Sequence, residues 1–156
     1  MRAVVQRVAR ARVTVDGELI AAIRGGLAIY LGVGPTDEPA VARHFAGRLV
    51  ELRIFPDAAG KMNKSLLAVG GEVLVVSQFT LFADTRRGHR PAFTAAADPE
   101  RGLELYRLFI DELRRLGVVR VSQGQFGAHM LVDSVNDGPV TIVAATSEAP
   151  WLADCG

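Results

Sequence analysis

The order in which strand-like and helix-like segments follow one another most constrains the fold of this chain. Apolar residues that alternate with polar ones predict strands, and apolar residues three or four apart predict helices. On these rules the chain runs as three strands, a helix, a strand, a second helix and three further strands. Because strands and helices do not alternate regularly, a doubly wound parallel sheet is not expected. The pattern predicts an α/β (α+β) protein in which a mixed, largely antiparallel or barrel-like β layer packs with two main helices.

The most definite strand signals lie next to glycine and proline. Asp16-Gly17 separates two strand-like runs and favours a two-residue hairpin turn, because both residues tolerate positive φ. Residues 27–33 form an uninterrupted apolar run between glycines, typical of a strand buried on both faces. Residues 129–135 and 140–144 predict two strands joined at Asn136-Asp137-Gly138-Pro139, whose residue types are typical of a hairpin turn. Weaker patterns predict a strand at residues 118–121 and loops at residues 56–64 and 83–97.

Both helices are predicted from apolar residues at helical spacing. Those of the first helix are Val41, Phe45, Leu49 and Leu52. Thr36 or Asp37 is expected to cap its start. In the second helix Asp98 is the expected N-cap and Pro99 the first helical residue. Gly117 is expected to end that helix, because glycine adopts the left-handed conformation easily.

Composition limits the possible partners and cofactors. The 156 residues fit one domain spanning residues 1–156, and 18 Lys+Arg against 17 Asp+Glu give a net charge of +1. That balance argues against broad nucleic-acid coating, so no DNA partner is expected. The single cysteine, Cys155, and three scattered histidines form no ligand pattern, so neither a metal nor an organic cofactor is expected. The N-terminus is charged at once and the apolar runs are short, which predicts a cytoplasmic protein without a membrane partner.

A polar segment closes the strand predicted at residues 73–82, namely Ser77-Gln78-Phe79-Thr80-Leu81. One interpretation is that the hydroxyls satisfy backbone groups at a strand end, and the residues alone favour it. The other is that Ser77 or Thr80 takes part in catalysis, which would require an activating base. His129 and Asp133 lie on one face of a later strand and are candidates for such a base and its partner.

An arginine-rich segment follows this strand. Arg86, Arg87 and Arg90 lie within five positions. Guanidinium groups suit phosphate, so the three are candidates for contact with a small phosphate-bearing group. A solvated loop is the alternative interpretation.

Beyond these patterns, the chain closely resembles the D-aminoacyl-tRNA deacylase family, the bacterial-type D-tyrosyl-tRNA(Tyr) deacylases. The resemblance covers nearly the whole chain, including its opening and the segment Gly60-Lys61-Met62-Asn63-Lys64-Ser65. Both signature motifs, S-Q-F-T-L at residues 77–81 and G-P-V-T at residues 138–141, are intact. Together and in this order the two motifs are highly specific.

The resemblance implies a homodimer that hydrolyses the ester of D-aminoacyl-tRNA, and also of glycyl-tRNA(Ala), without a cofactor. It implies that Gly138-Pro139 is cis and enters the partner subunit's site, where two carbonyl groups reject L-amino acids. Glycine has no side chain to reject. Backbone N–H groups around Phe79 and Thr80 would bind the carbonyl oxygen, and Ser77 and Gln78 would shape the pocket. Arg7 and Met130 are further candidates for substrate binding.

Two other functions stay open at this level. A conventional Ser/Thr esterase would lose its activity on Thr80→Ala, whereas a backbone-driven deacylase would keep much of it. A noncatalytic tRNA- or nucleotide-binding module would bind tRNA without releasing D-amino acid. The arginine segment fits both the deacylase and the binding module.

Overall fold

A mixed β-sheet forms the centre of the protein. The fold is that of a computed structural model, which describes residues 1–86 and 89–146. The six strands of this sheet are β1 (Arg2–Val15), β2 (Glu18–Ile23), β3 (Gly26–Gly32), β6 (Glu72–Ser77), β7 (Val121–Gln123) and β8 (Leu131–Ala145). Their order is β2-β1-β3-β6-β7, and β8 pairs with β1. The β1 pairings are antiparallel, whereas β3, β6 and β7 run parallel to one another.

The sheet curls toward a barrel. Ser122 Oγ, on β7, donates to the carbonyl of Ala22, on β2, at 3.3 Å, so the two ends of the strand order meet. The predicted mixed, barrel-like layer is thus confirmed. The Asp16-Gly17 turn is also as predicted, since the two residues have φ of 50° and 84°.

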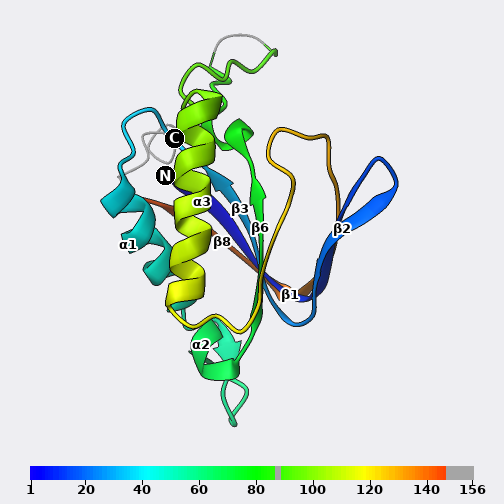
Figure 1. Cartoon of the computed structure of the whole chain (residues 1–156). Helices are drawn as coiled ribbons and strands as arrows, with labels where there is room; N and C mark the ends of the chain where they lie inside the picture. Colours follow the sequence, from blue (N-terminus) through cyan, green and yellow to red (C-terminus); the bar gives the residue numbers. More distant parts are fainter. Residues whose placement is uncertain (87–88, 147–156) are drawn as a thin grey trace.

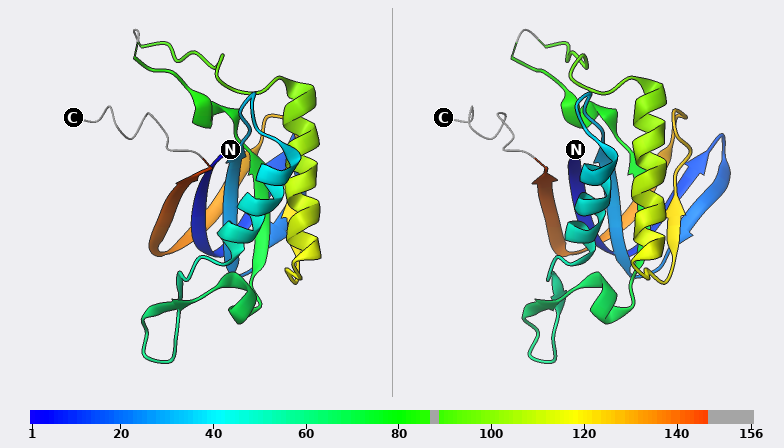
Figure 2. Two further views of the ribbon diagram at one scale, coloured as in Figure 1. Left: turned by 90° about the vertical axis from the view of Figure 1, so that its left-hand side faces the viewer. Right: turned by 60° about the vertical axis from the view of Figure 1, so that its left-hand side comes forward.

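Two helices, α1 (Pro39–Val50) and α3 (Pro99–Arg115), lie side by side over one face of the sheet (Figure 1, Figure 2). Their apolar stripes enclose the main core, in which Phe45 and Phe109 lie with ring centroids 6.4 Å apart. β3 crosses the middle of the sheet and is buried along nearly its whole length, as its uninterrupted apolar run predicts. No helix among residues 1–86 and 89–146 combines the length and apolarity needed to cross a bilayer.

The predicted caps of the two helices have different outcomes. The Asp98 carboxylate accepts from the Arg101 N–H at 3.0 Å, Pro99 begins α3, and Gly117 follows with φ of 85°. At α1 the prediction is wrong, because Glu38 is the N-cap residue and its side chain makes no cap hydrogen bond. The Asp37 carboxylate instead accepts from the Met1 α-amino group at 2.6 Å. A charged long-range partner has displaced the local cap.

Three further segments differ from the sequence prediction. The strand expected at residues 73–82 ends at Ser77, and a 3-10 turn, η1 (Phe79–Phe82), follows it. Residues 56–64 are not a loop throughout, because β4 (Phe55–Pro56) pairs with β5 (Met62–Lys64) and a short helix, α2 (Leu66–Val69), follows. The strand expected at residues 118–121 is β7, which begins only at Val121.

The last strand is a further correction. Residues 131–145 form one strand, β8, rather than two strands joined by a hairpin turn. β8 pairs with β1 on both sides of Gly138-Pro139, from Thr14↔Leu131 to Arg2↔Ala145. The turn-type residues sit at register shifts between Gln6 and Arg10, so the long partner strand overrides their local preference for a hairpin.

Candidate active site

A pocket of about 410 Å³ opens where β6 ends. Ser77, Gln78 and Phe79 form one wall. The other walls are largely apolar and come from β3, from the start of α3, from the loop before it and from the loop between β7 and β8; they include Leu31, Phe93, Ala96, Tyr106, Phe126 and Met130. Such a cavity, apolar with a few polar groups at one side, is typical of a small-molecule site.

The η1 turn begins at this wall. The Gln78 N–H donates to the Leu31 carbonyl at 2.8 Å, which is the last bond between β6 and β3. The Leu81 N–H donates to the Gln78 carbonyl at 3.2 Å. Phe79 and Thr80 are the first two residues of the 3-10 turn. The N–H groups at the start of such a turn have no carbonyl acceptor within the turn. Two adjacent N–H groups of this kind can bind an oxyanion.

The hydroxyl and amide side chains of this segment hold one another. Gln78 Nε2 donates to Thr80 Oγ1. Phe79 is 58% exposed and meets the Phe93 ring edge-on, with centroids 5.2 Å apart. Thr80 is not among the residues that line the pocket, whereas Ser77, Gln78 and Phe79 are. The Thr80 hydroxyl is therefore bonded to Gln78 and is not part of the pocket lining.

The suggested hydroxyl–imidazole–carboxylate arrangement has no support from Asp133. Its carboxylate accepts from Arg12 Nε at 2.8 Å and from Arg12 Nη2 at 2.5 Å, on the exposed surface of the β1–β8 pair. A carboxylate paired in this way is committed to a guanidinium rather than to His129.

Arg2 supports the η1 turn from behind. Its Nη1 donates to the Leu81 carbonyl at 2.8 Å, and its guanidinium lies 4.4 Å from the centre of the Phe82 ring. Phe82 is buried and lies flat against Gly32 and Gly34, where an added Cβ would come within 3.1 Å of the ring. These contacts fix the turn on the sheet.

Tyr106 fixes the floor of the pocket. Its hydroxyl donates to the Val75 carbonyl at 2.8 Å, and its ring lies 5.7 Å from that of Phe126. Burial raises the pKa of Tyr106, so the hydroxyl stays protonated and remains a donor.

Gly138-Pro139 lies away from the pocket of its own chain. The peptide bond is cis, as the family resemblance implies. Both residues are exposed. Arg7 holds the segment, since its Nε donates to the Asp137 carbonyl at 3.0 Å and its Nη1 to the Ile54 carbonyl at 2.5 Å. Arg7 does not line the pocket, whereas Met130 does.

The strand registers give the separation. Gly138-Pro139 lies beside Arg7, which pairs with Leu27 and, through it, with Val73. Ser77 is four residues further along β6, and β6 is three strands away from β8. The two parts are therefore about 13 Å apart along the strands and about 14 Å apart across them. One chain alone does not bring the two signature motifs together.

The arginine-rich segment is only partly described. Arg86 Nη2 pairs with Asp84 Oδ2 at 2.8 Å, and Arg90 is exposed. Arg87 lies outside the described residues. Among residues 1–86 and 89–146 no group of three His, Cys, Asp or Glu side chains is arranged to hold a metal ion.

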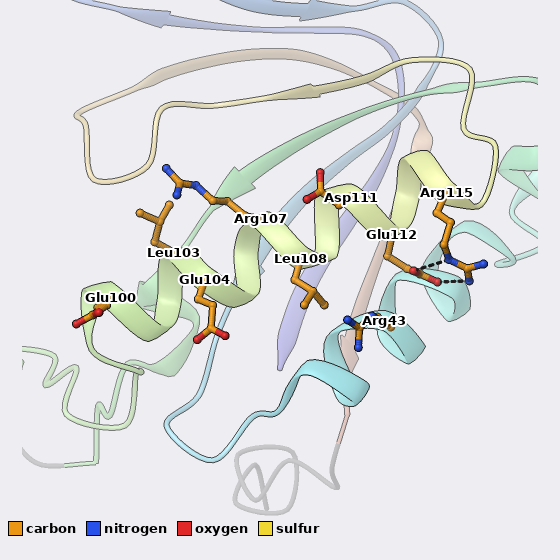
Figure 3. Close-up of a pocket in the computed structure, with 9 residues that line it drawn as sticks. All are labelled: Arg43, Glu100, Leu103, Glu104, Arg107, Leu108, Asp111, Glu112 and Arg115. Carbon is orange, nitrogen blue, oxygen red and sulfur yellow. Dashed lines mark hydrogen bonds and ion pairs between the residues drawn. The ribbon is translucent and has the colours of Figure 1, made fainter.

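A larger hollow, of about 630 Å³, lies elsewhere, along α3 and beside α1 (Figure 3). It is lined by charged side chains, and Glu112 and Arg115 pair with each other there at 2.6 Å. None of residues 77–82 lines it. Charged side chains of both signs line it, and neither signature motif contributes to it, so the smaller pocket is the better candidate site.

Several residues of the pocket were not candidates from the sequence. Phe93, Ala96 and Tyr106 line it, yet they come from a segment predicted as a loop and from the apolar stripe of α3. Met130, by contrast, is a candidate from the family resemblance and does line the pocket. The hydroxyl of Tyr106 is the signal that could have identified this residue, because a buried hydroxyl requires a hydrogen-bond partner.

The fold is that of known deacylase-like proteins. The structure matches one titled "Structural Analysis of a probable eukaryotic D-amino acid tRNA deacylase", with a TM-score of 0.81, 17% identity and coverage of 92% of this chain and 97% of that one. It also matches "c-Myc DNA Unwinding Element Binding Protein", with a TM-score of 0.89, 41% identity and coverage of 96% and 100%.

Sequence comparison gives the family. The family model described as D-Tyr-tRNA(Tyr) deacylase matches residues 4–145. A D-aminoacyl-tRNA deacylase of Deinococcus deserti is 58% identical over 142 residues, covering 91% of this chain and 97% of the relative. One from Roseiflexus sp. is 59% identical over 143 residues, covering 92% of each. The chain belongs to the D-Tyr-tRNA(Tyr) deacylase family.

Proposed function

We propose that this protein hydrolyses the ester bond of D-aminoacyl-tRNA and releases free tRNA and a D-amino acid. Family membership supports this activity. The observation that carries the site is the start of η1 at the pocket wall, where the N–H groups of Phe79 and Thr80 stand next to Ser77 and Gln78. An ester carbonyl placed there meets two backbone donors.

The chemistry needs no side-chain nucleophile. Water adds to the ester carbonyl carbon, and the negative charge that develops on the carbonyl oxygen is stabilised by the Phe79 and Thr80 N–H groups. The bond from that carbon to the ribose oxygen then breaks, and the ribose oxygen takes up a proton. The neighbouring ribose hydroxyl assists the water, while the pocket supplies positioning. A covalent role for the Thr80 hydroxyl is the secondary hypothesis, and its bond with Gln78 argues against it.

The selection against L-amino acids requires a second subunit. We infer a homodimer in which Gly138-Pro139 of the partner subunit closes the pocket. The separation of about 13 Å by about 14 Å within one chain supports this inference, because the segment is exposed and does not line its own pocket. Two rigid carbonyl groups would block one side of the substrate Cα and so exclude the L side chain.

Glycyl-tRNA(Ala) is the second proposed substrate. A wall that acts by steric exclusion admits glycine, because glycine has no side chain on either side of Cα. Ser77, Gln78 and Met130 shape the space that the aminoacyl group enters. Arg86, Arg87 and Arg90 follow this segment in the sequence and are proposed to face tRNA phosphates.

Paired hydrolysis of D-tyrosyl-tRNA and L-tyrosyl-tRNA by the purified, metal-stripped protein tests the proposal. We expect rapid loss of the D-ester only. Loss of both esters would indicate a general esterase, and loss of neither, with retained tRNA binding, would indicate a binding module.

A further inference from the structure

We propose that residues 53–64 of one subunit, here called the basic hairpin, contact the phosphate backbone of the tRNA whose aminoacyl end lies in the partner's pocket. Lys61 and Lys64 are the contacting side chains. The inference rests on the proposed function, since it takes the substrate and the dimer from there. It adds a tRNA-binding surface at the end of the sheet opposite the arginine-rich segment.

The basic hairpin and Gly138-Pro139 form one rigid unit. Arg7 joins them, because it donates both to the Ile54 carbonyl, at the base of the hairpin, and to the Asp137 carbonyl. Its Nε also lies 3.2 Å from Asp137 Oδ2, and only 11% of the Arg7 side chain is exposed. Both views in Figure 2 place the bend of β8 beside the start of the hairpin. Any subunit that receives Gly138-Pro139 must therefore also lie close to the hairpin.

The hairpin is held in shape by its own polar groups. Asp57 Oδ1 accepts from the N–H groups of Ala59 at 2.8 Å and Lys61 at 3.0 Å, and Asp57 Oδ2 accepts from Asn63 Nδ2 at 3.1 Å. Arg53 Nε donates to the Asn63 carbonyl at 2.8 Å. The backbone N–H of Lys61 and the other donors lower the pKa of Asp57, which stays ionised as the centre of this network.

This network leaves two cations facing outward. Asp57 is the only acidic residue of the hairpin, whose cations are Arg53, Lys61 and Lys64. Arg53 is engaged with Asn63. Lys61 and Lys64 are exposed and have no ion pair within 4 Å among residues 1–86 and 89–146. Exposed ammonium groups on a rigid support suit phosphate as point charges.

The position of the hairpin favours contact with the tRNA in the partner's pocket over contact with the tRNA in its own pocket. In the hairpin Phe55 pairs with Lys64. Phe55 follows Ile54, whose carbonyl accepts from Arg7, so Lys64 lies near Gly138-Pro139. The hairpin's own pocket is at the far end of β6. A tRNA whose terminal ester lies in the partner's pocket, beneath Gly138-Pro139 of this subunit, must pass that segment as it leaves the pocket. Its phosphates then lie within reach of Lys61 and Lys64.

The test compares a lysine variant on two substrates. We expect Lys61→Ala/Lys64→Ala to raise KM for D-tyrosyl-tRNA about tenfold, with kcat within about twofold. Hydrolysis of D-tyrosyl-adenosine, which has no phosphate backbone, stays unchanged. The slope of log KM against log salt concentration becomes shallower by about one to two. The matched control, Arg43→Ala/Arg107→Ala on the helices of Figure 3, removes the same charge and leaves both substrates unaffected.

Three results would overturn the inference. They are an unchanged KM for D-tyrosyl-tRNA, an equal loss on both substrates, and the same effect from the control variant. If the wild-type protein cleaves neither D-ester, the proposed function fails, and the hairpin is tested by nitrocellulose binding of uncharged tRNA. A weaker affinity of the lysine variant then supports the contact, and an equal affinity overturns it.

A mixed dimer tests which subunit's hairpin serves which pocket. One subunit carries Lys61→Ala/Lys64→Ala and an intact pocket; the other keeps the lysines and carries Ala96→Trp, which fills its pocket. Contact from the partner predicts the wild-type KM for D-tyrosyl-tRNA. A raised KM would mean that the hairpin serves its own pocket and would overturn the arrangement.

Discussion

Arg2 donates from Nη1 to the Leu81 carbonyl at 2.8 Å, across 79 positions of sequence. The same guanidinium lies over the buried ring of Phe82. Arg2 thus joins the first strand to the end of η1, whose opening residues present the proposed oxyanion donors. Leu81 and Phe82, which it contacts, are not among the residues that line the pocket, so Arg2 acts by positioning the turn.

Arg2→Met is expected to lower kcat about tenfold and to change KM less than twofold, because the donors lose their fixed placement. Arg2→Lys, which keeps a cation over Phe82, is expected to recover part of the rate. Steady-state hydrolysis of D-tyrosyl-tRNA measures both. Arg12→Met, which removes only the exposed pair with Asp133, is the control. A kcat equal to that of wild type would contradict the positioning role.

Thr80→Ala separates backbone from side-chain catalysis. We expect kcat within about tenfold of wild type, since the Thr80 N–H is retained and removal of a true nucleophile costs far more. Thr80→Val, which keeps the shape without the hydroxyl, is expected to behave alike. Single-turnover hydrolysis gives the rate. A complete loss of activity in both folded variants would favour the hydroxyl as nucleophile.

Gly138→Ala places a methyl group in a crowded position. The new Cβ would lie 2.7 Å from Val140 Cγ2 and 2.8 Å from the Val140 nitrogen, at φ of 141°. We expect the segment to shift, with a loss of about 1–3 kcal/mol in stability and about tenfold in the ratio of D- to L-ester hydrolysis. Gly17→Ala, at φ of 84° with no atom within 4 Å, is the control. It should lose stability and keep full selectivity.

Tyr106→Phe removes the buried hydroxyl but keeps the ring beside Phe126. The Val75 carbonyl still accepts from the Gly124 N–H at 2.9 Å, so no buried acceptor is orphaned. We therefore expect the free energy of unfolding to fall by about 1 kcal/mol, measured by urea denaturation. A loss of several kcal/mol would show that the hydroxyl supports more of the pocket floor than this one bond.

Glu72 links stability to acid. Its buried carboxylate accepts from the Arg24 N–H at 2.9 Å and from Arg24 Nε at 3.1 Å, and these contacts, the backbone bond first, lower its pKa below 4.5. The unfolded chain therefore binds this proton more readily than the folded protein does. The contribution of Glu72 to the free energy of unfolding is complete above pH 4.5 and is lost as pH falls through the lower pKa of the folded state. In the Glu72→Gln variant the free energy of unfolding should fall less steeply as the pH is lowered below 4.5. An unchanged steepness would contradict this linkage.

Local chemistry explains the features that the sequence predicted correctly. Asp16-Gly17, the buried run of residues 27–33 and the Asp98-Pro99 start of α3 depend on neighbours within a few positions. Residues 77–81 stood out as a polar strand end and Gly138-Pro139 as part of a turn, and the family resemblance identified both as signature motifs. Their separation within one chain was not predictable, because it depends on strand order and register.

The sequence by itself determined the two main helices, the start and end of α3, the buried strand at residues 27–33 and the residues that carry the signature motifs. The tertiary structure decided where β6 ends, that β8 continues through Gly138-Pro139, and that Arg7 holds groups 47 and 130 positions away. The physical reason is competition. A turn-forming segment extends when a long partner strand takes its hydrogen bonds, and Asp37 leaves a helix start for the Met1 amine. Such partners exist only once distant parts of the chain have packed together.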